Sequence, residues 1–298
     1  MKIPRFTVLM PTFDHGPMIV HAIESVLAQE MRDFQLVVIG DGAPDATRQT
    51  VEEIARRDGR VSYRAFPKGP RTGEEHRHIV LAEVRSPFIA YCADDDIWFP
   101  DHLDELARLL AGNDLVNTKP LNLKREPSKP RAIGPTPPAG LLRYVFRTGM
   151  RRFQDPGERE RMFADPPRSL VGLTPTAHRL SAYRRLPEGW SPAPAGIYTD
   201  INMWRKFLRD PDCRAFSGSR ITSLHFPSWQ RLDMSLEARD AETVFWARRM
   251  VDPQLRETVI GAFSRQNRLA VEDVLPQDAL GELARLGIHR PLASGGKR

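Results

Sequence analysis

Three consecutive aspartates, Asp94, Asp95 and Asp96, directly follow an apolar run at residues 87–92. Adjacent carboxylates repel one another, so three of them beside a buried strand require an explanation. The pattern leaves three interpretations open: a solvated helix cap, a metal site, or a centre for acid–base chemistry. Because the cluster offers carboxylates without a cysteine partner, it suits a hard divalent cation, Mg²⁺ or Mn²⁺.

Two further polar clusters follow apolar runs in the same way. Residues 11–15 (PTFDH) come after the run at 6–10, and residues 40–45 (GDGAPD) come after the run at 34–39. In open α/β sheets, ligands bind beyond the carboxyl ends of the parallel strands, so the three clusters are expected to share one site. Such cations usually bind through one or two carboxylates plus substrate phosphates. The residues therefore predict a metal-dependent enzyme that uses a nucleotide.

The elements that position these clusters alternate between strand and helix as far as residue 118. Apolar runs predict strands at 6–10, 34–39, 61–66, 87–92 and 114–118. Helical periodicity predicts helices between them, and Thr72 with Glu75 fits a capping box that opens the third helix. This alternation predicts a mainly parallel sheet with helices on its faces.

The pattern changes after residue 118. Six prolines between residues 119 and 140 predict a crossing loop. The later segments predict a helix at 198–208, a strand at 220–226, and two or three amphipathic helices within 235–287. We therefore expect one domain of residues 1–230, with a nucleotide-binding part at 1–118 and an acceptor-side part at 119–230, followed by a helical C-terminal extension at 231–298.

Composition narrows the classes of partner. The 298 residues carry a formal net charge of +6 and a sequence pI near 9.6, which favours polyanions such as nucleotides, phosphorylated lipids or an anionic membrane surface. Cys92 and Cys213 are the only cysteines, which argues against a disulfide framework or a cysteine-based zinc site. With 8% aromatic residues and no interleaved aromatic and basic stripes, nucleic acid ranks last among the partners.

The sequence shows no secretory signal and no apolar stretch of membrane-spanning length. We therefore expect a cytoplasmic protein, and peripheral contact with the inner membrane face stays open. The segment at 141–152, which mixes apolar residues with four arginines, allows two interpretations. It could form a lid or a lipid-docking segment, or a helix packed on the domain with its arginines in solvent.

Taken together, the motifs resemble a known family. The stretches VLMPTFDHGPMIVHAIESVLAQEMRDFQLVVIGDGAPDAT (8–47) and FIAYCADDDIWFPDHL (88–103) are similar to the family 2 glycosyltransferases of the GT-A fold. The similarity covers roughly residues 4–110 and resumes around YTDINMWRKFL (198–208). It implies a Rossmann-like, mainly parallel sheet flanked by helices. It also implies transfer of a sugar from a nucleotide diphosphate sugar to an acceptor hydroxyl, with inversion at the anomeric carbon.

The resemblance also assigns roles by position. The opening loop would face the base and ribose through Pro11, Thr12, Phe13 and Asp14. Asp41 would bind the base, Arg77 and Asp94 would hold the nucleotide, Asp95 would be the direct metal ligand, Asp200 would be the catalytic base, and His225 would add a metal or diphosphate contact. Asp200 could instead be a simple helix cap, His225 a satisfied strand histidine, and Arg77 a solvated helix arginine.

The expected function is a metal-dependent inverting glycosyltransferase with Mn²⁺ or Mg²⁺ and a UDP- or dTDP-type donor. The acceptor would be a saccharide, a lipid-linked molecule or a small molecule, in polysaccharide, glycolipid or metabolite glycosylation. Gly40 and Ala93 stand where many members have aspartates, which keeps open a degenerate domain that binds sugar nucleotides without turnover. A sugar nucleotidyltransferase is the other alternative, although residues 11–16 are not its glycine-rich basic loop.

Overall fold

The structure is a computed structural model that describes residues 2–127, 142–148, 152–166, 171–263 and 268–287. The chain divides into two compact units, which are described separately. Unit 1 comprises Met1–Pro120 and Met150–Ser223, and unit 2 comprises Leu121–Gly149 and Leu224–Arg298. The division predicted from the sequence, at residue 230, concerns function and stays a prediction.

Unit 1 begins with a parallel sheet, as the sequence predicts. Its strands are β1 (Phe6–Thr12), β2 (Phe34–Asp41), β3 (Val61–Phe66) and β4 (Phe88–Tyr91), in the order β4-β1-β2-β3. β8 (Thr176–Arg179) adds antiparallel to β4, and the first residues of β6 (Leu115–Pro127) add antiparallel to β8. β5 (Ile97–Trp98) pairs with β9 (Ala215–His225). The fold class is therefore confirmed, with the parallel strands at the N-terminal side of the chain.

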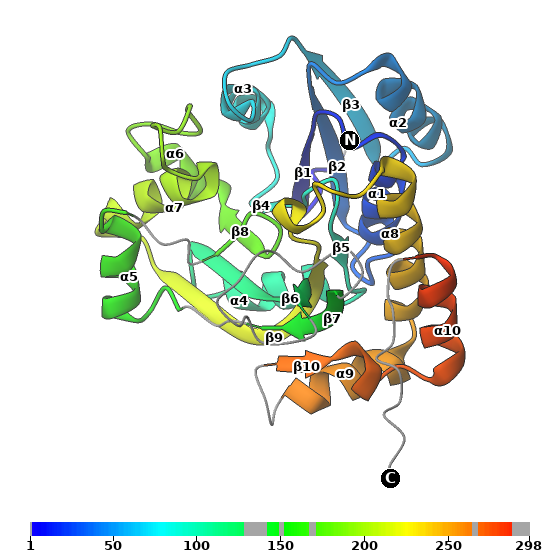
Figure 1. The fold of residues 1–298 in the computed structure, drawn as a ribbon. Helices are drawn as coiled ribbons and strands as arrows, with labels where there is room; N and C mark the ends of the chain where they lie inside the picture. The colour runs from blue at the N-terminus through cyan, green and yellow to red at the C-terminus, as the bar shows by residue number, and fades with distance from the viewer. Residues whose placement is uncertain (1, 128–141, 149–151, 167–170, 264–267, 288–298) are drawn as a thin grey trace. The chain divides into compact units, whose positions relative to one another are not determined.

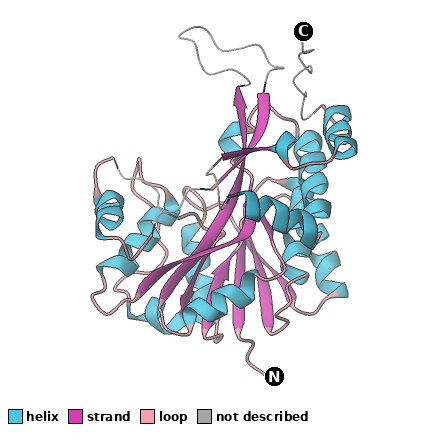
Figure 2. Ribbon diagram, turned by 90° about the horizontal axis from the view of Figure 1, so that it is seen from below, coloured by secondary structure: helices cyan, strands magenta, loops and turns pink. Residues whose placement is uncertain are grey.

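Helices cover both faces of this sheet because successive strand residues point to opposite sides. On one face, Phe6, Val8 and Met10 of β1 pack in a cluster with α1 (Ile19–Leu27), α2 (Asp45–Arg57) and α4 (His102–Leu110). On the other, Leu9 packs in a cluster with α3 (Glu74–Glu83), α6 (Leu180–Arg185) and α7 (Thr199–Arg209). α5 (Pro156–Phe163) contributes Met162 to the second cluster. Figure 1 shows β1, β2 and β3 side by side with α1 and α2 next to them, and Figure 2 shows strands with helices beside them.

Unit 2 combines the rest of β6 with a short antiparallel sheet and helices. β7 (Leu142–Arg147) pairs with β6 on one side and with β10 (Arg268–Ala270) on the other. The helices are α8 (Leu236–Met250), α9 (Pro253–Phe263) and α10 (Gln277–Arg285), so the predicted C-terminal helices are present. Within the described residues, no helix is both long and apolar enough to cross a membrane.

The structure corrects three predictions about local structure. The crossing loop predicted at 119–140 is wrong for residues 119–127, which belong to β6 and pair with β7 from residue 122 onward. Residues 128–140 lie outside the described residues. The helix predicted within 141–152 is wrong for residues 142–147, which form β7, and the lid or lipid-docking role of this segment stays a prediction. Tyr144, Val145 and Phe146 are β-branched or aromatic and fully buried, which favours a strand paired on both sides. The capping box is also wrong, because α3 begins at Glu74 after Gly73, whose φ of 65° places it in the left-handed region.

Candidate active site

The three polar clusters lie at one edge of the unit 1 sheet. β1 lies between β2 and β4, with Thr12 opposite Gly40 and Leu9 opposite Tyr91. All three strands run in the same direction, so the loops that follow them start side by side at their carboxyl ends. The structure thus brings together the segments that the sequence predicts to share a site.

The first two aspartates of the triplet lie next to a histidine that the sequence reasoning did not assign. His15 Nδ1 lies 2.7 Å from Asp94 Oδ1, and His15 Nε2 lies 4.0 Å from Asp95 Oδ2. One ligand atom from each of the three residues lies within 4.8 Å of the others. Both aspartates are buried, and Asp94 Oδ2 has no hydrogen-bond partner. One imidazole and two carboxylates, with an unsatisfied oxygen among them, fit a divalent cation such as Mn²⁺.

Asp96, the third aspartate, has a structural contact instead. Thr174 Oγ1 donates a hydrogen bond of 2.5 Å to Asp96 Oδ2 and accepts one of 3.1 Å from the Ala93 backbone N–H. Trp98 Nε1 donates to the carbonyl oxygen of Thr174 at 3.3 Å. Asp96 therefore links the aspartate loop to the segment that carries Thr174. It does not cap α4, which begins at His102 with Asp101 as its N-cap.

Asp41, the predicted base contact, is buried among donors from the loop that follows β3. Lys68 Nζ donates to Asp41 Oδ2 at 2.8 Å, and the Gly69 backbone N–H donates to Oδ1 at 2.6 Å. His76 Nε2 lies 3.2 Å from the same Oδ1, and its ring stacks on Phe66 with a centroid distance of 4.5 Å. This arrangement presents a carboxylate and an ammonium side by side, which a nucleobase with both donors and acceptors could contact.

The opening loop borders this group. The Lys68 ammonium lies 5.1 Å from the ring centroid of Phe13, which is exposed. Thr12 is buried and its Oγ1 has no hydrogen-bond partner, while Pro11 is half-buried and Asp14 is exposed. Phe13 is thus placed near Asp41 through Lys68, and the nucleotide contact of Asp14 stays a prediction.

Arg77 is a buried cation with unsatisfied donors. Only 3% of the residue is exposed, its Nε and Nη1 have no hydrogen-bond partner, and its guanidinium carbon lies 4.9 Å from the Trp190 ring centroid. Burial lowers the pKa of Arg77, and the nearby charges of Glu74, Asp41 and Asp200 act against this. A buried guanidinium with free donors is suited to an anionic ligand such as a phosphate. Its burial is inconsistent with a solvated helix arginine.

Asp200 is the second residue of α7, whose N-cap is Tyr198, so Asp200 does not occupy the helix-cap position. The Ile201 backbone N–H donates to Asp200 Oδ1 at 2.8 Å. Asp200 Oδ2 lies 3.9 Å from the position of a Cβ added to Gly172. Gly172 is two residues from Thr174, which contacts Asp96, so one short segment borders both acidic groups. Asp200 is therefore on the side of unit 1 that carries Arg77 and the aspartate loop.

His225 is the last residue of β9 and belongs to unit 2. Its predicted metal contact stays a prediction.

Solved structures with the same fold are known. The chain matches S. aureus TarS 1-349 with a TM-score of 0.53 and 14% identity, over 95% of this chain and 80% of that one. It also matches the mannosyltransferase PcManGT from Pyrobaculum calidifontis, in complex with GDP-Man and Mn²⁺, with a TM-score of 0.50 and 16% identity, over 98% and 77% of the two chains. The architecture of unit 1 and the similarity to these solved structures therefore define the chain as a GT-A-like α/β protein.

The family follows from the sequence match. The description "Glycosyl transferase family 2" applies to residues 7–155, and the chain belongs to this family of glycosyltransferases. Among its curated relatives, a GalNAc(5)-diNAcBac-PP-undecaprenol beta-1,3-glucosyltransferase of Campylobacter jejuni is 26% identical over 97 residues, 32% of this chain and 30% of that protein. The succinoglycan biosynthesis protein ExoW of Rhizobium meliloti is 31% identical over 101 residues, 33% and 32% of the two. The matches span about a third of each relative's length.

Proposed function

We propose that this protein is a metal-dependent inverting glycosyltransferase that uses a nucleotide diphosphate sugar. The observation that carries the proposal is the buried guanidinium of Arg77, whose Nε and Nη1 lack hydrogen-bond partners. The His15, Asp94 and Asp95 cluster at the same edge of the sheet would hold the cation that shares the diphosphate charge. TarS has been solved with UDP-GlcNAc, and PcManGT with GDP-Man and Mn²⁺, which supports a sugar-nucleotide donor and a metal for this chain.

In this mechanism, Asp95, Asp94 and His15 would hold Mn²⁺ or Mg²⁺, which would supply Lewis-acid stabilisation of the leaving diphosphate. Arg77 binds the same diphosphate through its unsatisfied N–H groups, and its burial strengthens that attraction. Asp200 accepts the proton of the acceptor hydroxyl while the oxygen attacks the anomeric carbon from the face opposite the leaving group. This single displacement inverts the configuration at that carbon.

The base-side residues favour a UDP- or dTDP-type donor. Uracil and thymine present one N–H between two carbonyl oxygens, which matches a carboxylate acceptor beside an ammonium donor. Asp41 and Lys68 offer this pair at 2.8 Å from each other, with Phe13 close to Lys68. The names of the Campylobacter and Rhizobium relatives support an acceptor in polysaccharide or lipid-linked glycan synthesis.

A degenerate domain that binds sugar nucleotides without turnover is the second candidate, because Gly40 and Ala93 replace aspartates expected at those positions. Binding and turnover must therefore be measured separately. A thermal-shift panel of UDP, dTDP, GDP, CDP and ADP, each with and without Mn²⁺, measures binding. A nucleotide at 100 times its dissociation constant should add about 2.7 kcal/mol to the free energy of unfolding.

The expected result is a shift with UDP or dTDP that requires Mn²⁺ and is lost in Asp95→Asn. Asp104→Asn serves as the control, since Asp104 is an exposed residue of α4. Slow hydrolysis of the matching sugar nucleotide, abolished in Asp200→Asn, would then show turnover. Binding without hydrolysis or transfer would favour the degenerate domain, and no shift with any nucleotide would overturn the proposal.

A further inference from the structure

The carboxylate of Glu74 joins the N-termini of α3 and α7, although these helices are more than a hundred residues apart. Glu74 is fully buried. Its Oε1 accepts hydrogen bonds from Thr199 Oγ1 at 2.8 Å and from the Ala193 backbone N–H at 3.4 Å. Its Oε2 accepts one from the Thr72 backbone N–H at 3.1 Å. A single side chain thus holds the turn before α3, the loop before α7 and the first residue of α7.

Further contacts tie the same two segments together. Thr72 Oγ1 and Thr199 Oγ1 lie 3.0 Å apart, and Arg71 Nη2 donates to the carbonyl oxygen of Ile197 at 2.9 Å. Gly73 packs so closely against Asp41 that an added Cβ would lie 2.6 Å from the carboxyl carbon. The turn at residues 71–73 therefore contacts the base-side carboxylate on one side and the start of α7 on the other.

Glu74 also acts on the charge at the site. Arg77 follows it by three residues on α3, and the Glu74 charge is the strongest of those that raise the Arg77 pKa against the effect of burial. Burial acts to raise the pKa of Glu74 itself, but hydrogen bonds, including those from Thr199, Ala193 and Thr72, outweigh it and lower the pKa overall. Glu74 is thus an anion at neutral pH, set between the diphosphate-binding cation and the helix that carries Asp200.

We propose that Glu74 is a positioning residue that orients Asp200 through Thr199. The hydrogen bond to Thr199 fixes the first turn of α7, and Asp200 is the next residue in that turn. This inference rests on the proposed function, since it requires Asp200 to be the catalytic base. A misplaced base affects the chemical step more than donor binding, so Glu74 and Thr199 should influence kcat rather than the KM for the donor.

The test compares Thr199→Val, Thr199→Ser and Glu74→Gln with Glu75→Gln as the matched control. Glu75 is the neighbouring carboxylate in the same turn of α3, but it is exposed. Steady-state rates with the sugar nucleotide that the wild type hydrolyses or transfers give kcat and KM. Hydrogen exchange of residues 199–205 reports the order of the first two turns of α7 without reference to activity.

Thr199→Val should lower kcat by about ten- to a hundred-fold, the cost of a misplacement near 1 Å, and leave the donor KM within about two-fold. It should also speed exchange at residues 199–205. Thr199→Ser keeps the hydroxyl and should restore kcat. Glu74→Gln keeps an acceptor oxygen but removes the charge, so its kcat should lie between those of Thr199→Val and Thr199→Ser. Glu75→Gln should match the wild type.

The outcomes separate this inference from the proposed function. An active wild type with an unchanged kcat and unchanged exchange in Thr199→Val overturns the positioning role alone. A loss in Thr199→Val that Thr199→Ser does not restore, or that appears only as a lower melting temperature, also overturns it. A wild type that turns over no sugar nucleotide, at a rate no different from Asp200→Asn, overturns the proposed function and this inference with it. Should Glu74→Gln fail to fold, the two Thr199 variants still decide the question.

Discussion

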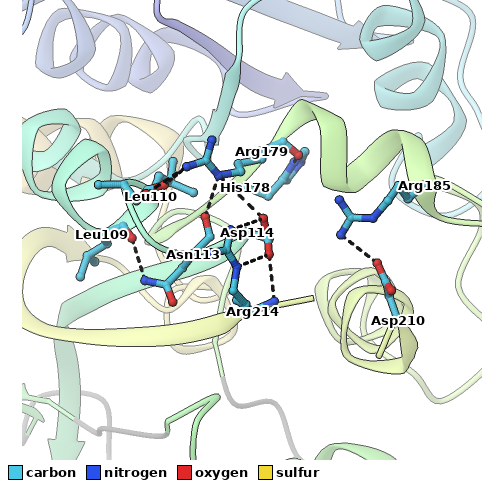
Figure 3. A network of polar contacts seen from close by, with 10 residues as sticks. Leu109, Leu110, Asn113, Asp114, His178, Arg179, Arg185, Asp210 and Arg214 are labelled. Atoms are coloured by element: carbon cyan, nitrogen blue, oxygen red, sulfur yellow. Dashed lines mark hydrogen bonds and ion pairs between the residues drawn. The ribbon is translucent and has the colours of Figure 1, made fainter. Parts of the chain in front are cut away.

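Unit 1 contains two buried acidic regions whose hydrogen bonding differs. Asp114 accepts hydrogen bonds from the backbone N–H, Nε and Nη2 of Arg214 at 3.0 to 3.3 Å, and Arg179 Nε lies 3.7 Å from it. Figure 3 shows this network, in which Arg179 also donates to the carbonyl oxygens of Leu110 and Asn113. Asp94, with a similar burial, has His15 on one oxygen and no hydrogen-bond partner on the other.

The two carboxylates differ in whether the chain satisfies their hydrogen bonds. The chain supplies donors to both oxygens of Asp114, whereas one oxygen of Asp94 is left for a ligand. Burial alone would raise the pKa of Asp114, but the hydrogen bonds and charge of Arg214 outweigh it and lower the pKa. Both of its oxygens are thus satisfied by the chain, which makes Asp114 part of the structure. The unsatisfied oxygen of Asp94 makes that aspartate costly to the apo fold, and a cation would recover the cost.

The largest expected effect is on the chemical step. Asp200→Asn should lower kcat by about 10²–10⁴-fold, the typical contribution of a general base, while the Mn²⁺-dependent nucleotide shift persists. Asp114→Ala, measured per folded molecule, should keep its kcat. Initial rates and thermal shifts on the two variants make the comparison. Equal losses of kcat in both would mean that the active site and the Asp114 network are not separate.

The next effect is on stability at low pH. It concerns His178, which is adjacent to Arg179 of the Asp114 network. His178 Nδ1 lies 3.0 Å from the Arg179 carbonyl oxygen and Nε2 lies 2.7 Å from the Tyr91 hydroxyl. Burial lowers the pKa of His178 to about 4, against about 6.5 when unfolded. The unfolded state therefore binds a proton first as the pH falls below about 6.5, and the free energy of unfolding should fall by up to about 1.4 kcal/mol per pH unit until about pH 4.

Urea denaturation between pH 7 and 4 measures this slope. His102, whose pKa burial lowers to about 3, adds to it in the wild type, so the contribution of His178 is the difference between wild type and His178→Gln. A variant whose stability falls as steeply as that of the wild type would show that His178 is not held neutral.

A smaller loss of stability is expected when the Asp114 network is disrupted directly. Asp114→Ala should reduce the free energy of unfolding by about 1–3 kcal/mol, because it leaves the donors of Arg214 and Arg179 without their buried acceptor. The loss is limited because Arg214 is largely exposed and water can replace part of the interaction. Chemical denaturation at pH 7 is the measurement, and Asp104→Asn is the control, for which no change is expected. A change below 0.5 kcal/mol in Asp114→Ala, within the range of ordinary surface substitutions, would contradict the structural role.

The same two regions show what could be predicted from the sequence. The apolar runs and the clusters after them were sufficient for the parallel strands and for the edge at which Asp41 and Asp94 lie, because these depend on local periodicity and on strand direction. Asp114 gave no local signal, since its partners Arg179 and Arg214 are 65 and 100 residues away in the chain, respectively.

The residues that the sequence reasoning missed depend on the same kind of long-range contact. His15 stood inside a quoted motif, and its metal-binding residue type beside a predicted carboxylate site was an available signal. Glu74 was overlooked because the capping-box pattern pointed to Glu75. Whether Glu74 or Glu75 is buried depends on the left-handed turn at Gly73 and on the contact with Thr199, which is 125 residues away in the chain.

The smallest expected effect is the sharpest test of the comparison. Asp94→Asn removes one of three consecutive carboxylates, so without metal its free energy of unfolding should equal that of the wild type or exceed it by about 0.5 kcal/mol. This sign is opposite to that of Asp114→Ala. With Mn²⁺ the order should reverse, because the wild type gains binding energy that the variant has lost. Melting curves with EDTA and with Mn²⁺ measure both arms. A variant that is destabilised in EDTA would place Asp94 with Asp114, as a carboxylate that the fold itself requires.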